Sequence, residues 1–272
     1  MSLFSFTSFA GTPRVVALEF SFAEDLVAIG ITPVGIADDG RPSQLLPALQ
    51  NLHIQSVGSR AQPNIEAIAA LHPTLIIADK NRHSFITDQL RQIAPTLLLA
   101  SRRANYTENI NAAFQIGKSL GLSQKMRQRI KQHRDLFGHL RQQLIPYQHQ
   151  PILFMISRGP SIFVHSADSY IGGLLTALGL TPAETGFNDS QPSRQISIEQ
   201  LLAMNPDRLL LGRYGRYSLS QIWKNDPLWH SLPAVQKHHI YTVNGNIWVK
   251  GRGLLSSEIM AKRIVGILVH SS

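Results

Sequence analysis

The chain contains no cysteine among its 272 residues. This absence excludes disulfide bonds, metal sites with thiolate ligands and cysteine nucleophiles together. It is compatible with an oxidising compartment, where a stray thiol would be a liability, without requiring one. Stability must come from hydrophobic cores, and hydrophobic residues make up 43% of the chain. That fraction is enough to fill two domains of ordinary size.

Long apolar runs are also missing. The longest are short segments such as residues 75–78 and 97–100, far below the roughly 18 residues that a membrane-spanning helix needs. Residues 1–10 are apolar and serine-rich but carry no positive charge, so they do not form a complete signal peptide. The composition predicts a soluble, globular protein.

The common motifs of catalysis and nucleotide binding are absent from the sequence. No G-x-G-x-x-G follows a predicted strand, and there is no phosphate-binding P-loop, nucleophile elbow or H-E-x-x-H helix. Eleven histidines are scattered along the chain, and no pattern assembles an acid, a base and a nucleophile. A binding protein is therefore favoured, with an enzyme acting on a small anionic substrate as the alternative.

The charge is strongly positive. Lys and Arg number 26 against 17 Asp and Glu, a formal net charge of +9. Nucleic-acid-binding proteins usually cluster their basic residues, whereas here no more than two stand in a row, as in Arg102-Arg103. Arginine in turns suits bidentate recognition of carboxylate or phosphate. The charge pattern favours an anionic small ligand over a nucleic acid.

Short β-branched runs alternate with helical patterns, which is typical of α/β folds. Nine strands are predicted, at residues 14–18, 33–36, 54–57, 74–78, 96–99, 152–156, 161–164, 208–211 and 240–243. Helices are predicted near residues 23–29, 64–71, 85–93, 106–120, 124–144, 169–178, 197–204, 218–225 and 256–269. We expect an N-terminal α/β lobe at 12–121, a connecting helix at 122–146 and a C-terminal α/β lobe at 147–272. The fold class is thus two α/β lobes with parallel-type sheets, joined by one long rigid helix.

An internal similarity supports two related lobes. Residues 64–77 align without gaps on residues 197–210, about half the chain later. Each copy predicts a short helix with a glutamate in its first turn, Glu66 or Glu199, followed by a proline and an apolar strand. Two lobes imply a cleft, and ligands bind in clefts between lobes.

Arginines recur just after predicted strands in both halves. In parallel sheets, ligands lie beyond the carboxyl ends of the strands, so these side chains are expected to meet at one anionic site. The basic residues concerned are Arg60, Arg82, His83, Arg102, Arg103, Arg158, Arg213, Arg216, Lys250 and Arg252.

Several segments resemble a known family, the periplasmic substrate-binding proteins of iron-siderophore and cobalamin ABC importers. The resemblance covers residues 12–270 and is carried by residues 16–23, 33–39, 57–63, 65–71, 76–79, 82–83, 92–99, 226–229 and 248–253. It implies a monomeric, periplasmic protein that has no enzymatic activity, no cofactor and no metal ligands of its own. Its partners would be an iron(III) chelate and an inner-membrane ABC permease.

Within this family the chain is most similar to binders of ferric dicitrate, a compact anion that would suit an arginine-rich cleft. A catecholate or hydroxamate siderophore is the alternative ligand, and haem or cobalamin is favoured less. Arg60 matches an arginine that contacts the ligand in hydroxamate-binding relatives, and Glu66 and Glu199 match the glutamates that dock on the permease. Arg194, Tyr214 and Trp248 complete the expected ligand site, although Arg194 and Arg213 are additions to the dicitrate pattern.

Overall fold

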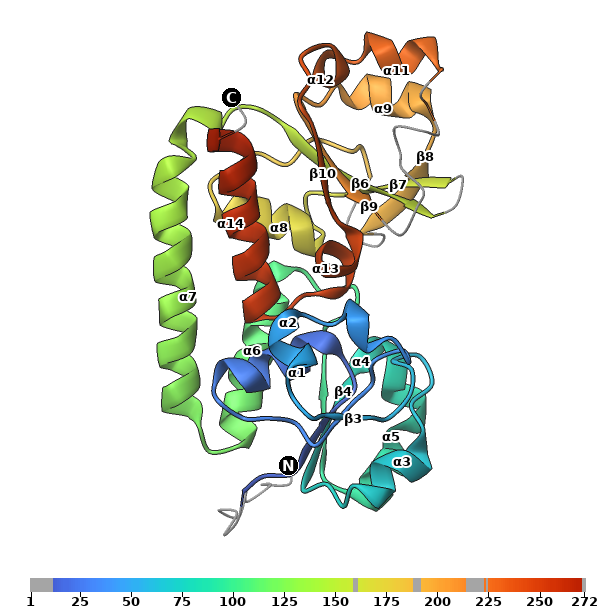
Figure 1. Cartoon of the computed structure of the whole chain (residues 1–272), viewed down its shortest axis with the longest axis vertical. Helices are drawn as coiled ribbons and strands as arrows, with labels where there is room; N and C mark the ends of the chain where they lie inside the picture. The colour runs from blue at the N-terminus through green and yellow to red at the C-terminus, as the bar shows by residue number, and fades with distance from the viewer. Residues whose placement is uncertain (1–11, 159–160, 188–191, 214–222, 224, 271–272) are drawn as a thin grey trace. The chain divides into compact units, whose positions relative to one another are not determined.

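The computed structural model describes residues 12–158, 161–187, 192–213, 223 and 225–270. These residues form two compact α/β units (Figure 1). The first unit contains residues 12–102, Glu108–His133 and Gly253–Leu255, and the second contains the described parts of Arg103–Thr107, Arg134–Arg252 and Ser256–Ser272. Neither unit is a continuous stretch of sequence, because three helices have residues in both.

The first unit is built on a parallel sheet with the strand order β3-β2-β1-β4-β5. Its strands are β1 (Val15–Ala17), β2 (Gly35–Ile36), β3 (Gln55–Ser56), β4 (Leu75–Asp79) and β5 (Thr96–Leu99). Its helices are α1 (Phe20–Ala28), α2 (Pro47–Gln50), α3 (Ile65–Ala70), α4 (Lys80–His83), α5 (Thr87–Ile93) and most of α6 (Tyr106–Ser119), with 3-10 turns at Pro42–Gln44 and Ser84–Ile86. The five strands predicted for this half are all present, each within a few residues.

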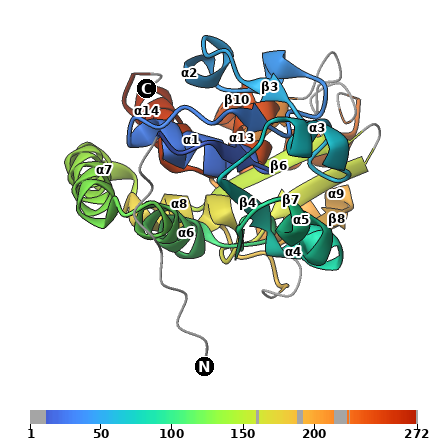
Figure 2. The same cartoon turned by 90° about the horizontal axis from the view of Figure 1, so that it is seen from below.

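Both faces of the sheet are buried at its central strands β1 and β4, which explains the apolar runs of these two strands. Val15 and Ala17 point into one core with Phe22 and Leu26, while Val16 points into another. The second core also contains Ile68 of α3 and Leu90 of α5, and these two helices lie beside each other in Figure 2. Alternate side chains of one strand therefore serve opposite faces.

The second unit has the strand order β10-β9-β6-β7-β8. Its strands are β6 (Ile152–Arg158), β7 (Ser161–His165), β8 (Ser193–Ile196), β9 (Arg208–Arg213) and β10 (Ile240–Asn244). Its helices are α8 (Tyr170–Ala177), α9 (Ile198–Met204), α11 (Pro227–Ser231), α12 (Pro233–Gln236), α13 (Gly245–Lys250) and most of α14 (Leu254–His270), with a 3-10 turn at Ile145–Tyr147. The helix predicted near residues 218–225 falls largely outside the described residues.

This second sheet is mainly parallel, as the sequence predicted, and it contains one strand of opposite direction, β7. β6, β9 and β10 run parallel, but β6 pairs antiparallel with β7, and β7 with β8. The reason is length, because β7 begins three positions after β6 ends. A parallel crossover needs a dozen or more residues, whereas a hairpin needs about two. β8 was not predicted, and it supplies the edge of the sheet.

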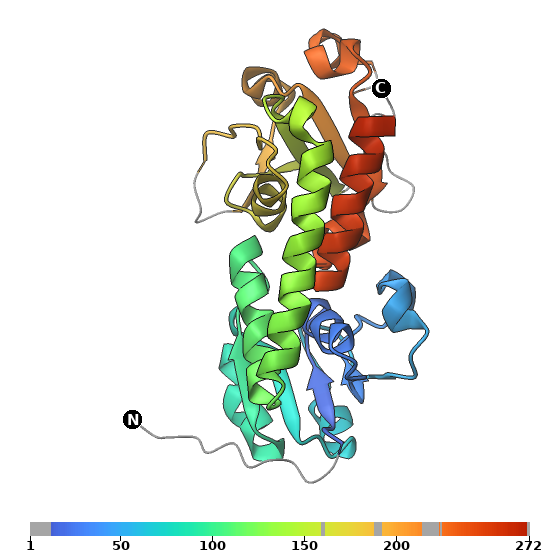
Figure 3. The ribbon, with the colours of Figure 1, turned by 90° about the vertical axis from the view of Figure 1, so that its left-hand side faces the viewer.

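The long helix α7 (Ser123–Gln143) is one uninterrupted element of 21 residues (Figure 3). Its rise of about 1.5 Å per residue corresponds to roughly 30 Å. Met126 and Ile130 belong to a core of the first unit, and Phe137 and Leu140 belong to a core of the second. In the first unit α6 and α7 approach closely at Gly117, where an added Cβ would come within 2.4 Å of Met126. Among the described residues no helix is long and apolar enough to cross a membrane.

The two similar segments of sequence also fold alike. The side chains of Asn64 and Ser197 cap α3 and α9 by accepting a backbone hydrogen bond from the third residue of each helix. After each helix a residue with positive φ, His72 at 44° and Asn205 at 43°, precedes a proline. The chain then enters β4 or β9, and each pairs in parallel with the first strand of its unit. The internal similarity therefore marks the same helix–turn–strand segment in both units.

Candidate functional site

Ionisable side chains gather beyond the carboxyl ends of the strands of the first unit. We call Glu19, Asp39, Arg60, Arg82 and His83 the Arg60 cluster. They follow β1, β2, β3 and β4, and the fully parallel sheet brings these strand ends to one edge. Glu19 and His83 have no exposed surface, and Arg60 is 6% exposed. Charges buried so deeply must be paired, because water cannot solvate them.

Arg60 is held on three sides. Its Nη2 and Nε donate to Asp39 Oδ2 at 2.6 and 3.1 Å, and its backbone N–H donates to Asp39 Oδ1 at 2.9 Å. Its Nη1 lies 3.5 Å from Glu19 Oε2, and its guanidinium lies 4.0 Å from the ring centre of Phe20. Burial opposes the charge, but the hydrogen bonds that Arg60 donates to Asp39 and the charges of both carboxylates outweigh it and raise the pKa of Arg60.

Glu19 joins the two arginines of this cluster. One carboxylate oxygen faces Arg60, and the other forms an ion pair with Arg82 Nε. The Arg82 side chain is 18% exposed, so it is the more accessible of the two guanidinium groups. Two arginines and two carboxylates compensate each other here. The guanidinium of Arg60 is therefore already paired with carboxylates of its own unit.

His83 occupies a structural position, which differs from its predicted contact with ligand. Its Nδ1 accepts the backbone N–H of Asp79 at 2.9 Å, and its Nε2 donates to the backbone carbonyl of Arg60 at 2.8 Å. Burial lowers the pKa of His83, and the charges of Glu19 and Asp79 only partly oppose this. Both ring nitrogens are thus used inside the protein, and the ring is neutral.

Asp79 arranges the next loop, which carries Arg102. Its Oδ2 accepts the backbone N–H groups of Ser101 and Arg102, each at 2.8 Å, and Asn81 donates to the Arg102 carbonyl at 2.5 Å. Arg102 and the adjacent Arg103 are exposed. Arg103 has a φ of 65°, which turns the chain sharply. The exposed cations of this loop are therefore placed by buried hydrogen bonds.

In the second unit, Arg158 and Arg213 close β6 and β9. The pairing of Ile156 with Gly212 places the ends of these two parallel strands side by side. Arg213 is exposed, whereas the side chain of Arg158 and the whole of Tyr214 and Arg216 lie outside the described residues. Arg252 is half-buried and donates to the carbonyl of Val249 at 2.8 Å.

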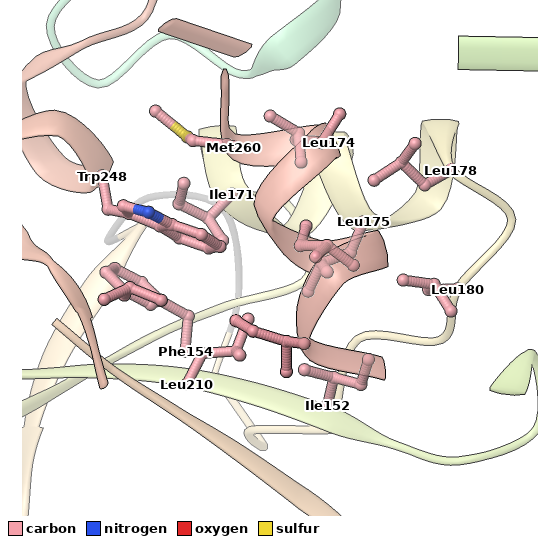
Figure 4. Packing of buried hydrophobic residues seen from close by; sticks show 14 of the residues in the cluster. Ile152, Phe154, Ile171, Leu174, Leu175, Leu178, Leu180, Leu210, Trp248 and Met260 are labelled. Atoms are coloured by element: carbon pink, nitrogen blue, oxygen red, sulfur yellow. The ribbon is translucent and has the colours of Figure 1, made fainter. Parts of the chain in front are cut away.

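Two other predicted residues of this unit, Arg194 and Trp248, differ in their exposure. Arg194 is exposed on β8 and lines a hollow of about 590 Å³ together with Asp168, Glu184 and Phe187. Trp248 is only 3% exposed and stacks on Phe154, with ring centres 5.4 Å apart (Figure 4). Trp248 therefore contributes to the hydrophobic core rather than to an accessible surface.

Glu66 and Glu199 occupy equivalent places. Each is the second residue of its helix, α3 or α9, and both are exposed. The side-chain hydrogen bond of Ser197 and the local backbone lower the pKa of Glu199. Acidic residues in a first turn are favoured by the helix dipole. A contribution to helix stability would therefore be enough to explain why glutamate occurs at these two positions.

Sequence reasoning missed Glu19, Asp39 and Asp79, the carboxylates that hold the arginines. The available signal was their position, because each closes or directly follows a strand of the first sheet. In the described part of the chain, no group of three or more histidine, aspartate or glutamate side chains is placed to hold a metal ion.

Two α/β units connected through one long helix, with charged groups at the carboxyl edges of their strands, define the class of two-lobe substrate-binding proteins. The chain belongs to the periplasmic binding protein family, whose sequence model matches residues 15–246. It is therefore a substrate-binding protein and not an enzyme.

Two curated relatives cover most of the chain. The Fe(3+) dicitrate-binding periplasmic protein FecB of Escherichia coli is 41% identical over 94% of this chain and 85% of its own length. The Fe(3+)-citrate-binding protein YfmC of Bacillus subtilis is 36% identical over 95% of this chain and 82% of its own length. Among solved structures, Staphylococcus aureus SirA complexed with staphyloferrin B has a TM-score of 0.82, with 22% identity over 96% of this chain and 94% of that chain. That likeness shows the fold.

Proposed function

We propose that this protein binds a ferric-carboxylate chelate, with ferric dicitrate favoured, in the periplasm and delivers it to an inner-membrane ABC permease. The observation that carries the proposal is the similarity, at 41% and 36% identity over nearly the whole chain, to two proteins whose names state binding of ferric citrate. They come from two different bacteria, so the shared ligand is not a peculiarity of one host.

The charge of the chain suits such a ligand. In ferric dicitrate the carboxylates outnumber the positive charges on iron, and each charge-assisted hydrogen bond from arginine contributes about 1.5–3 kcal/mol. Four or five such bonds, after the cost of association, are consistent with a Kd of about 1 μM. Citrate already fills the coordination shell of iron, so the protein needs no metal ligand of its own.

The exposed arginines are the candidates for direct contact. Arg102, Arg103 and Arg213 are exposed at strand ends, and Arg82 is partly accessible. Arg60 would support them from within, since its guanidinium is already paired. The sequence predicts that arginines of both units contact the same ligand, and this stays a prediction.

We further propose that Glu66 and Glu199 dock on basic side chains of the permease. Both are exposed at equivalent points of the repeated segment. Exposed ion pairs of this kind contribute more to orientation and association rate than to affinity. A monomer presents one glutamate from each unit, which suits a permease with two similar halves.

Thermal unfolding with a panel of ligands tests the proposal. A ligand that binds only the folded protein raises the Tm. We expect a shift with ferric citrate, a smaller one with citrate alone, and none with a neutral ferric hydroxamate. A shift with the hydroxamate and none with ferric citrate would reject the citrate assignment. No shift with any ferric chelate would reject iron transport altogether.

A further inference from the structure

We infer that His83 is a positioning residue that functions only as a neutral ring. Its two hydrogen bonds, which we call the His83 clamp, join the loop of Arg60 to the end of β4. Acidification breaks the clamp and thereby weakens ligand binding. The inference rests on the proposed function for its effect on ligand. Its effect on the ligand-free protein is independent of what the ligand is.

The geometry determines the protonation state of the ring. Nδ1 receives the N–H of Asp79 at 2.9 Å, so this nitrogen must carry a lone pair and no proton. Nε2 lies 2.8 Å from the carbonyl of Arg60, so this nitrogen must carry the proton. A protonated ring would direct a second N–H at the N–H of Asp79. Two donors would then face each other in a site with no exposed surface, and one hydrogen bond of the clamp would be lost.

The clamp connects the loop that carries Arg60 with the loop that carries Arg102. On one side it fixes the backbone of Arg60, whose guanidinium contacts Glu19. On the other side it fixes Asp79, whose carboxylate holds the loop of Arg102. Loss of the clamp would therefore loosen two loops that the proposed ligand site needs in place.

Some charged groups around the ring raise the pKa of His83 and others lower it. Glu19 and Asp79 favour a protonated ring, whereas Arg82 disfavours it. Arg60 contributes its carbonyl, which accepts the Nε2 proton. Burial outweighs the two carboxylates, and the pKa of His83 lies below its usual 6.5. The unfolded chain therefore takes up this proton more readily than the folded protein does, so the stability of the fold decreases as pH falls below about 6.5. Ligand binding weakens at lower pH, where the ring of the folded protein itself takes up the proton.

The test compares the wild type with His83→Gln, whose amide offers a donor and an acceptor but does not ionise. The Kd for ferric citrate is measured for both proteins from about pH 7.5 to about pH 4.5. Protonation of citrate itself cancels in the ratio of the two values. We expect the ratio of wild-type to variant Kd to rise about three- to tenfold toward low pH, as one coupled proton allows. His53→Gln, at an exposed histidine of the same unit, should leave the wild-type profile unchanged.

A second measurement, on the ligand-free proteins, distinguishes failure of this inference from failure of the proposed function. The urea midpoint of the wild type should fall relative to that of His83→Gln below about pH 6.5. Parallel midpoints would overturn the inference even if ferric citrate binds, and diverging midpoints would support it even if no chelate binds. Should the variant fail to fold, ¹⁵N NMR of the wild-type ring decides. A proton on Nε2 alone at about pH 7 is expected, and a proton on Nδ1 would overturn the inference.

Discussion

The carboxylate of Asp25 accepts the backbone N–H of Leu254 at 2.9 Å, across 229 positions of sequence. Asp25 belongs to α1 in the first unit, and Leu254 is the first residue of α14. The four first N–H groups of a helix lack partners within it, and here a distant side chain supplies one. Glu24, beside Asp25, packs against the residue that precedes α14, Gly253. The start of the last helix is therefore specified by the first helix.

Two replacements of Asp25 should distinguish the contribution of its hydrogen bond to stability from the contribution of its charge. Burial and the charge of Glu24 raise the pKa of Asp25 well above its usual value, although the bond from Leu254 and the charge of Arg129 oppose this. The folded protein therefore binds this proton more tightly than the unfolded chain, and stability falls as pH rises through the folded pKa.

We expect Asp25→Asn, which keeps an acceptor, to match or exceed wild-type stability at about pH 8 and to show a flatter pH profile. Asp25→Ala should lose about 1–2 kcal/mol because the cap is gone. Urea unfolding at several pH values measures both variants. A stability of the Asn variant below that of the wild type at about pH 8 would show that the charge itself is needed.

Replacement of Glu19 should be costly, because two arginines depend on it. Glu19→Ala leaves Arg60 with Asp39 alone and removes the ion pair of Arg82, and breaking a buried pair costs about 3–5 kcal/mol. The matched control is Asp88→Ala, which removes an exposed ion pair with Arg91 and should cost less than about 1 kcal/mol. Equal losses in chemical denaturation would contradict the burial argument.

Substitution of Gly253 tests the fit between α1 and the start of α14. A Cβ at this position would lie 2.6 Å from the Cβ of Glu24 and 2.8 Å from the carbonyl oxygen of Ser21. We expect Gly253→Ala to destabilise the protein by about 1–3 kcal/mol through overpacking. Gly266→Ala within α14 meets no atom within 4 Å and should stabilise by about 0.5–1 kcal/mol, because alanine favours helix. Thermal and urea unfolding of both variants give the comparison.

Charge reversal at Glu66 and Glu199 should separate ligand capture from delivery. Both side chains are exposed, so Glu66→Lys and Glu199→Lys should leave the Kd for ferric citrate within about twofold of the wild type. Stimulation of the permease ATPase should fall for each variant and fall further for the double variant, because opposite charges become like charges. Glu108→Lys, an exposed glutamate in the first turn of α6, is the control. Full stimulation by the double variant would remove these residues from the docking surface.

Much of the architecture could be predicted from local patterns. The strands of the first sheet and the long helix α7 follow from apolar periodicity and from the prolines that end helices. The opposite direction of β7 was not predicted, because a composition pattern does not reveal strand direction, and β8 was not predicted at all. β8 also has polar and exposed residues, Arg194 and Gln195, so it lacks the apolar signal by which the other strands were found.

The candidate site was predicted less completely. The positions of Arg60, Arg82 and His83 after their strands were apparent, and the structure brings them together. Their partners were not apparent, because Glu19 lies 41 positions and Asp39 lies 21 positions from Arg60. Burial also could not be inferred for Trp248, whose ring could equally face a ligand or a core.

The sequence by itself determined the alternation of strands and helices, the repeated helix–turn–strand segment and the positive charge, because these depend on residues that are neighbours along the chain. Only the tertiary structure decided which of those charges are already compensated. Glu19, Asp39 and Arg60 meet because three parallel strands end at one edge, and ion pairing depends on distances in space rather than on order in sequence.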